Sequence, residues 1–207
     1  GKGNAGIKFW NIMGKNASCG DAEYAITPAG ITAVTSTNSK YSCTGHEDGT
    51  IVMWEGNTIS DAKVVGNHNG AVSALAYVGT DILISGSTDS IKLFKKTVTE
   101  EKNKNDSTTD IPVITIEWIL TKEISLLDIV KTIGRTYESY GSPSVTSIAS
   151  DKYSKRLLVS LSSNVLVEIN VSSAAASIIT EGTRKTDDTV LSLAHPTEEF
   201  TIVSLSK

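Results

Sequence analysis

Short stretches of alternating apolar and polar residues recur along the chain. The segment "AVSALAYV" at 71–78 alternates as a half-buried strand does, and "DILISGSTDSIKLF" at 81–94 places two apolar runs on either side of a polar turn. Related arrangements occur at 30–54, 144–169 and 189–206. A period of two residues, bounded by Gly, Ser, Asn and Asp, predicts strands joined as hairpins. The pattern therefore favours an all-β protein.

These segments also form a repeat. A small or polar turn, then Ile or Val, then an aromatic end recurs as "GNAGIKFW" (3–10), "HEDGTIVMW" (46–54) and "STDSIKLF" (87–94), and "LSSNVLVE" (161–168) is a weaker copy. Trp10 and Trp54 are 44 residues apart, and Trp54 and Phe94 are 40 apart. A four-stranded blade of the WD40 type takes about 40–45 residues.

The spacing predicts a WD40-like β-propeller that is partial, with about four blades and incomplete blades at both ends. Only "EISLLDIVKTI" (123–133) has helical character. The whole chain is expected to be one propeller segment, with an insertion near 95–130 in its longest repeat. Its repeat units are 1–10 (the end of a blade), 11–54, 55–94, 95–168 and 169–207.

A buried polar set ties strands together in many blades of this type, because buried polar groups need hydrogen-bond partners. Thr44, Asp48 and Trp54 occupy three such positions in one repeat. In the next repeat His68, Ser85 and Asp89 do so, and Phe94 replaces the Trp. We expect these six residues to be structural.

Other interpretations of the polar residues remain open. His68, Ser85 and Asp89 are also the residue types of a hydrolase triad. "HEDG" (46–49) could suggest a metal site, although Asp48-Gly49 is a good turn pair. His195 is expected in an exposed turn. We favour the structural interpretation in each case and expect no enzyme activity and no cofactor.

The opening "GKGNAG" has the G-x-G-x-x-G spacing of a phosphate-binding loop. Such a loop needs a strand before it and a helix after it, because the helix N-terminus holds the phosphate. Here no strand precedes the glycines, and a strand is expected to follow. We therefore interpret them as a turn.

The insertion has two parts. Residues 95–110 are charged and polar without apolar periodicity, and this composition predicts a mobile loop. "IPVITIEWIL" (111–120) alternates strongly and contains Trp118. We favour an outer strand packed on the blade; the alternative is a β-arm that meets a partner through Trp118.

Composition limits the partners. The net charge is -4, so the chain is not expected to bind nucleic acid, and no apolar run is long enough to span a membrane. Cys19 and Cys43 form no C-x-x-C pair, which is typical of an intracellular protein with free thiols. Because a propeller segment with two open ends exposes apolar faces and strand edges, we also expect self-association through those edges.

The order of these motifs resembles the echinoderm microtubule-associated protein-like (EMAP-like) family, over about 170 of the 207 residues. The departures are the insertion, Phe94, and Leu191 near the place of a family tryptophan. The segments that carry the resemblance are "IKFWNI" (7–12), "YSCTGHEDGTIVMWEG" (41–56), "NHNGAVSALAYVGTDILISGSTDSIKLF" (67–94), "YGSPSVTSIAS" (140–150), "LLVSLSSNVLVEI" (157–169) and "DDTVLSLAHP" (187–196).

The resemblance implies a tandem propeller that binds tubulin or microtubules, and hence a cytoplasmic, cytoskeletal location. The tubulin surface is acidic, so an acidic chain would need a local basic patch to bind it. The alternative is a general peptide-binding adaptor in a cytoplasmic complex. The candidate partner-binding residues, besides Trp118, are Lys92, Lys95, Lys96, Lys152, Lys155 and Arg156.

Overall fold

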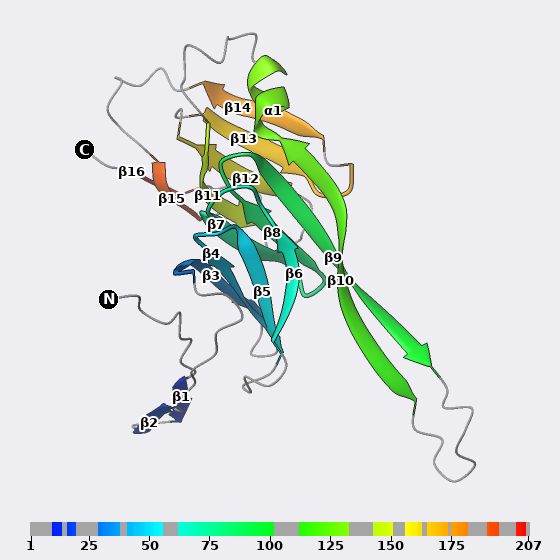
Figure 1. The fold of residues 1–207 in the computed structure, drawn as a ribbon. Helices are drawn as coiled ribbons and strands as arrows, with labels where there is room; N and C mark the ends of the chain where they lie inside the picture. The colour runs from blue at the N-terminus through cyan, green and yellow to red at the C-terminus, as the bar shows by residue number, and fades with distance from the viewer. Residues whose placement is uncertain are drawn as a thin grey trace.

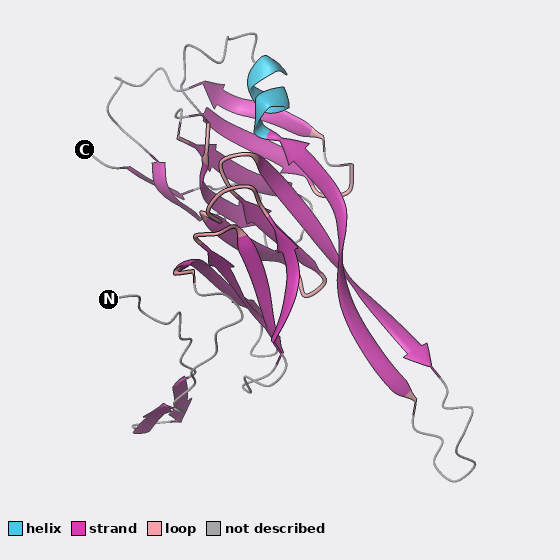
Figure 2. Cartoon of the chain, viewed as in Figure 1, coloured by secondary structure: helices cyan, strands magenta, loops and turns pink. Residues whose placement is uncertain are grey.

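In a computed structural model, most of the described residues form antiparallel sheet, and there is one short helix (Figures 1 and 2). For β1, β2, β15 and β16 the structure describes the backbone alone. The glycines at 1–6, Lys152, Lys155 and His195 lie outside the described residues. These residues are 10–13, 16–19, 29–37, 41–55, 62–101, 112–132, 143–150, 156–162, 165–173, 175–181, 190–194 and 202–205.

Three four-stranded sheets, here called the first, second and third blades, make up the body of the molecule, and their strands follow chain order. The first blade contains β3 (Ile31–Thr37), β4 (Tyr41–His46), β5 (Thr50–Glu55) and β6 (Ala62–Asn67). The second contains β7 (Ala74–Val78), β8 (Ile82–Gly86), β9 (Ser90–Glu101) and β10 (Val113–Ser125). The third contains β11 (Val145–Ser150), β12 (Arg156–Leu161), β13 (Val165–Asn170) and β14 (Ala176–Glu181).

Two-stranded sheets lie before and after the three blades in the chain. They are β1 (Trp10–Met13) with β2 (Asn16–Cys19), and β15 (Val190–Ala194) with β16 (Ile202–Leu205). The first strands of successive sheets contact one another, β3 with β7, β7 with β11, and β11 with β15. Successive four-stranded antiparallel sheets that meet along their first strands form the predicted all-β, partial propeller.

The predicted repeat units are offset from these blades by one strand. The unit 55–94, for example, contains β6 of the first blade followed by β7, β8 and β9 of the second. Residues 123–133 form the helix α1 (Leu126–Thr132) only in part, since β10 continues to Ser125. Leu126, Ile129 and Val130 of α1 are buried, and the first two pack on the core between the second and third blades.

The hydrophobic core lies between blades. One cluster joins the first and second blades and includes Cys43, Ile51, Leu83 and Phe94. A larger cluster joins the second and third blades. Because the second blade lies between the first and the third, β7 and β8 are largely buried on both faces and read as nearly continuous apolar runs rather than strict alternation.

The same contact joins each pair of blades. Val72, just before β7, lies against Gly45, and Val145 at the start of β11 lies against Gly86. The N–H of Val72 donates to the carbonyl of His46 at 3.0 Å, and the N–H of Val145 donates to that of Ser87 at 3.0 Å. A Cβ at Gly86 would lie 2.5 Å from Val145 Cγ1, so only glycine lets the valine approach.

Hydroxyl groups add a second tie at each of these junctions. Thr32 Oγ1 donates to the carbonyl of Gly45 in the first blade at 3.1 Å and to that of Val72, just before β7, at 2.6 Å. Ser73 Oγ makes the corresponding contacts with the carbonyls of Gly86 and Val145. Side chains from one blade thus satisfy backbone groups of the next, and the relative position of the blades is set by hydrogen bonds as well as packing.

The expected loop at 95–110 is wrong for 95–101, because β9 continues to Glu101. β-Branched Thr97, Val98 and Thr99 favour strand, and β10 pairs with them. Residues 102–111 lie outside the described residues. The last pair of β8 with β9 is Ile82 with Lys95, so 96–101 and 113–118 form a two-stranded extension, here called the arm, that projects beyond the blades (Figure 1).

The outer-strand interpretation of 111–120 holds in part: β10 is the outermost strand of the second blade, but its residues 113–118 lie in the arm, beyond the last pair of β8 with β9. A β-bulge interrupts its pairing between Leu120 and Lys122. The bulge adds one residue and so exchanges the two faces of the strand. Trp118 packs on the core shared with the first blade, whereas Ile124, beyond the bulge, packs on the core shared with the third.

We predict that Gly86→Ala lowers the free energy of unfolding by about 1–3 kcal/mol, as overpacking of a dense contact does. The added methyl group would press against Val145, whose Cα belongs to another sheet and cannot shift independently. Urea unfolding followed by tryptophan fluorescence measures the change. Thr97→Ala, at an exposed position of the arm, is the control and should change stability by less than about 0.5 kcal/mol. Equal unfolding midpoints for the two variants would contradict the prediction.

Candidate functional site

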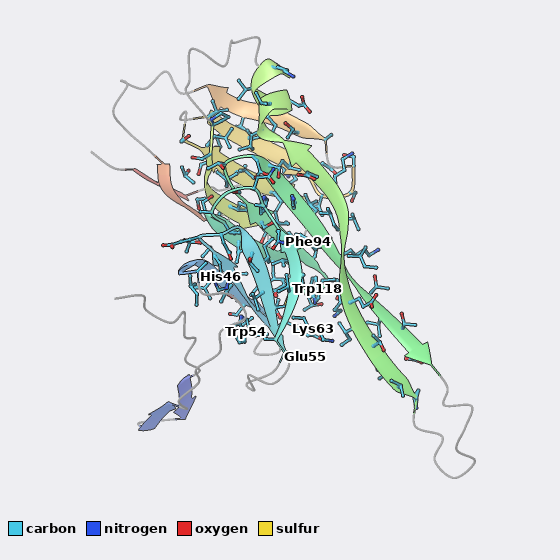
Figure 3. The ribbon with its side chains drawn as sticks, viewed as in Figure 1. His46, Trp54, Glu55, Lys63, Phe94 and Trp118 are labelled. Atoms are coloured by element: carbon cyan, nitrogen blue, oxygen red, sulfur yellow. The ribbon has the colours of Figure 1, made fainter. Side chains whose placement is uncertain are left out.

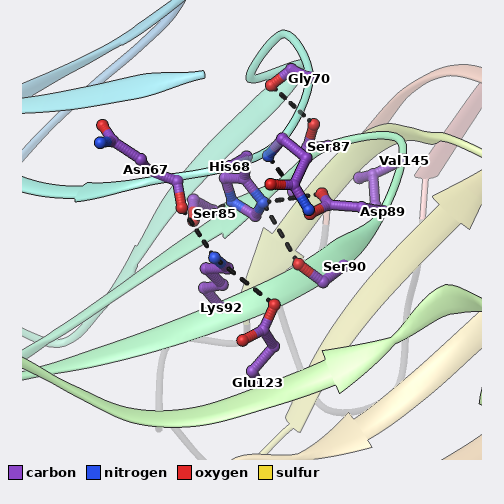
Figure 4. Close-up of polar contacts among 12 residues, drawn as sticks. Asn67, His68, Gly70, Ser85, Ser87, Asp89, Ser90, Lys92, Glu123 and Val145 are labelled. Atoms are coloured by element: carbon purple, nitrogen blue, oxygen red, sulfur yellow. Dashed lines mark hydrogen bonds and ion pairs between the residues drawn. The ribbon is translucent and has the colours of Figure 1, made fainter.

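The structure brings together His68, Ser85 and Asp89, as the sequence predicted (Figure 4). His68 lies just after β6, Ser85 on β8, and Asp89 in the turn between β8 and β9. The distance from His68 Nε2 to Ser85 Oγ is 2.8 Å, and that from His68 Nδ1 to Asp89 Oδ1 is 3.0 Å. Because the Asp89 carboxylate accepts, Nδ1 carries the proton and Nε2 accepts from the serine hydroxyl.

The distances between these side chains are those of a hydrolase triad. Whether Ser85 could act as a nucleophile therefore depends on whether a substrate can reach it. Ser85 is completely buried, and the His68 side chain has no exposed surface. Further contacts hold the set: Ser90 Oγ lies 3.3 Å from His68 Nδ1, and the N–H of Asn69 donates to Asp89 Oδ2 at 3.4 Å. A serine nucleophile must reach a carbonyl carbon of its substrate, and the buried Ser85 hydroxyl is inaccessible to one.

Burial governs the charge of this set. It lowers the pKa of His68 below 6.5, and this effect outweighs the hydrogen bond and the charge of Asp89, which act in the opposite direction. Burial also acts to raise the pKa of Asp89, but hydrogen bonds from His68 and from backbone N–H groups lower it below 3.8. At neutral pH the set is therefore a neutral imidazole that donates to a carboxylate.

The buried polar set of the first blade contains Thr44 and Trp54, as predicted, and also His46, which was not predicted to belong to it. Trp54 Nε1 donates to Thr44 Oγ1 at 3.0 Å, as expected. His46, expected in a polar turn, is buried at the end of β4 instead, with Nε2 3.0 Å from Thr44 Oγ1 and Nδ1 3.2 Å from the carbonyl of Ala29. Asp48 lies in the exposed turn, where it accepts from the N–H of Thr50 at 2.9 Å.

His46 is a residue whose role sequence reasoning missed. It follows Gly45 as Ser87 follows Gly86, and Ser87 Oγ donates to the carbonyls of Gly70 and Ala71 before β7. His46 makes the corresponding contact before β3. The matching triplets Thr-Gly-His (44–46) and Ser-Gly-Ser (85–87) are the signal that could have identified it.

The basic candidates that the structure describes are mostly paired. Lys92 donates to the carbonyl of Asn67 at 2.7 Å and lies 3.4 Å from Glu123. Lys96 is 2.8 Å from Asp81, and Arg156 is 3.4 Å from Glu168. Lys95 is exposed on β9. The three lysines of β9 therefore do not act as one patch of free positive charge.

Trp118 lies where the arm leaves the blades (Figure 3). Its ring makes edge contacts with Tyr41 and Tyr77, with centroid distances of 6.0 and 5.8 Å. Its indole Nε1 is buried and has no hydrogen-bond partner in the structure. Trp118 also borders a groove of about 420 Å³ between the arm and the first blade.

The structure gives no sign of a metal site or a membrane span within the part of the chain it describes. No group of three or more His, Cys, Asp or Glu side chains there could hold a metal ion, and of "HEDG" only 47–49 lie in the turn, because His46 ends β4. No described helix is long and apolar enough to cross a membrane. Cys43 is a buried free thiol whose pKa burial raises far above its usual value.

We predict that stability falls as the pH is lowered from 8 to 5, and that His68→Asn reduces this dependence. Because the pKa of folded His68 lies below 6.5, the unfolded chain binds protons more readily below that pH, and folding loses stability. Urea unfolding at several pH values measures the slope. The variant keeps the other two histidines, so the difference in slope reports His68. Identical slopes would contradict the assignment.

Comparison with known proteins places the fold. No protein-family model and no curated protein sequence matches the chain. Among solved structures it is similar to the RRP9 WD40 repeats and to U3-55K, each at 11% identity with a TM-score of 0.54. It is also similar to the computationally designed protein Ika4, at 15% identity and a TM-score of 0.54.

The three matches differ in how much of each partner they cover. The alignments cover 85% of this chain with RRP9 and U3-55K, and 45% and 46% of those chains. With Ika4 they cover 88% of this chain and 92% of that one. The chain thus spans less than half the length of the two WD40 proteins. At these identities the likeness concerns the fold alone, and the protein is an all-β, partial propeller of the WD40 type.

Proposed function

We propose that this chain is part of a non-catalytic propeller that serves as a protein-interaction scaffold. The observation that carries the proposal is the burial of the triad-like set His68, Ser85 and Asp89. Ser85 and His68 have the residue types and the distance of a catalytic pair, but both are buried. Their hydrogen bond joins β8 to the loop after β6. The exposed features are the arm and the groove beside it.

As the partner we propose tubulin, with a cytoskeletal location. The support is the ordered resemblance of the motifs to the EMAP-like family. Since Lys92, Lys96 and Arg156 lie beside carboxylates, the contact would depend on local charges such as Lys95, Lys152 and Lys155 rather than on net charge. The alternative is a peptide-binding adaptor, which the groove favours because it combines apolar walls with a few polar groups.

We predict that the folded chain does not react with a fluorophosphonate probe, which labels activated serines. Ser85 cannot reach the probe while the blade is folded, because its side chain is completely buried. Labelling is measured by in-gel fluorescence, with trypsin as the positive control. Labelling of the wild-type chain that disappears in Ser85→Ala would overturn the non-catalytic proposal.

We predict that the chain co-sediments with microtubules and that pelleting falls with rising salt. Neutralising Lys152, Lys155 and Arg156 together to Gln should reduce pelleting several-fold, because the tubulin surface is acidic. The control neutralises Lys122 and Lys131, which are exposed elsewhere, and should pellet as the wild type does. If a folded, unaggregated chain does not pellet at low salt, tubulin is not the partner and the adaptor function remains.

A further inference from the structure

The groove between the first blade and the arm is lined along the edges of two strands. Its walls come from β6 and β10, and its base includes the buried Tyr41 and Met53. The full lining is Tyr41, Met53, Glu55, Lys63, Val64, Val65, Thr115, Ile116, Glu117, Trp118 and Ile119.

The lining residues are consecutive on both strands, 63–65 on β6 and 115–119 on β10. Since neighbouring side chains of a strand point to opposite faces, five successive residues border one groove only if it runs along the backbone edge. Each strand is the last of its sheet: in the described chain β6 pairs only with β5, and β10 only with β9. The groove therefore lies between two edges that offer unpaired N–H and C=O groups.

These edges are bordered by exposed aliphatic side chains. Val64 is 50% exposed and Ile119 is 47% exposed. Free edges in soluble proteins are usually protected by charges, prolines or a covering segment, whereas here Lys63 and Glu117 are the only charged residues on the two lining stretches. An unpaired edge beside apolar side chains is the surface that accepts an added strand from another protein.

Trp118 supplies an independent indication of a ligand. Its indole N–H is buried without an acceptor, and this costs free energy unless an acceptor is bound beside it. Tyr41 and Tyr77 make edge contacts with the ring, and Trp118 lines the groove, so a small turn of the ring would bring the covered N–H to an acceptor in the groove. A backbone carbonyl oxygen is the acceptor that every peptide strand carries.

The charges at the groove favour a peptide over a phosphate-bearing ligand. Glu55 and Glu117 line the groove together with one lysine, Lys63, and two carboxylates would repel a nucleic acid or a phosphate group. A segment with little net charge and aliphatic residues at alternate positions matches the apolar walls and the mixed charges together.

We propose that this groove binds an extended segment of a partner protein as an added β-strand on the free edge of β10. Its alternate aliphatic side chains pack on Val64, Ile116 and Trp118, and, once the indole ring has turned toward the groove, one of its carbonyl oxygens accepts from the Trp118 N–H. The inference rests on the proposed scaffold function and adds the site and the chemistry of the partner.

The test uses a random ten-residue peptide library displayed on phage and selected on the immobilised 207-residue chain. Enriched peptides, made synthetically, are titrated by fluorescence anisotropy. We expect alternating aliphatic sequences whose affinity falls at least tenfold for Val64→Lys and Ile119→Lys. Val98→Lys is the matched control, because Val98 is also 50% exposed and lies on the arm outside the groove lining; its affinity should stay within twofold.

Trp118→Phe tests the indole contact separately. It keeps an aromatic ring between Tyr41 and Tyr77 but removes the N–H, and should weaken binding about 3- to 10-fold, the loss of one neutral hydrogen bond. Circular dichroism confirms that each variant is folded.

Three results would overturn the proposal. These are peptides that bind the groove variants as tightly as the wild type, a library that yields no binder, and a chain that self-associates until Val64→Lys makes it monomeric, which would make a second copy the occupant. None of them bears on the probe-labelling or microtubule experiments, so this inference can fail while the scaffold function stands.

Discussion

The rest of this structure depends on one contact between blades, in which a valine side chain packs against a glycine. At both described junctions a valine before or at the first strand of one sheet fills the space that a glycine leaves on the second strand of the previous sheet. A backbone hydrogen bond and a Ser or Thr hydroxyl close the same junction. Since a single sheet of this size cannot bury both of its faces, the blades are stable only together.

The buried polar sets hold the chain connections beside these junctions. His68 belongs to the connection between the first and second blades but is held by Ser85 and Asp89 of the second. His46 holds the connection before β3 in the same way. Imidazole suits this role because it donates on one side and accepts on the other. Residues of catalytic types at catalytic distances can therefore have a purely structural role when they are buried.

Much of this could be predicted from the sequence. Period-2 alternation and the 40-to-44-residue spacing of Trp10, Trp54 and Phe94 were sufficient for the repeat and the propeller, because both follow from local pattern. The contact of His68 with Ser85 and Asp89 followed from repeat position. Thr32, Ser73 and Thr146 also share a position, between a β-branched residue and a small one at the start of β3, β7 and β11, but only their hydrogen bonds across strands and blades show their use.

The arm and groove could not be predicted in the same way. Residues 95–101 are charged and polar, and they form a strand because β10 pairs with them from more than ten residues away. The place of His46 in the first-blade set likewise depends on where the chain before β3 passes, since His46 Nδ1 contacts the carbonyl of Ala29. A groove bordered by two strand edges exists only once two sheets are placed, so no local pattern encodes it.

The bulge in β10 limits how this chain can diverge. One strand contributes Trp118 to one core and Ile124 to the next, and the single extra residue between Leu120 and Lys122 makes this possible. If the strand kept all of its residues but lost the bulge, Trp118 and Ile124, six positions apart, would face the same side, and one of them would leave its core. A deletion that removes the bulge together with its extra residue keeps them on opposite faces, so the residue count between them and the bulge can change only together.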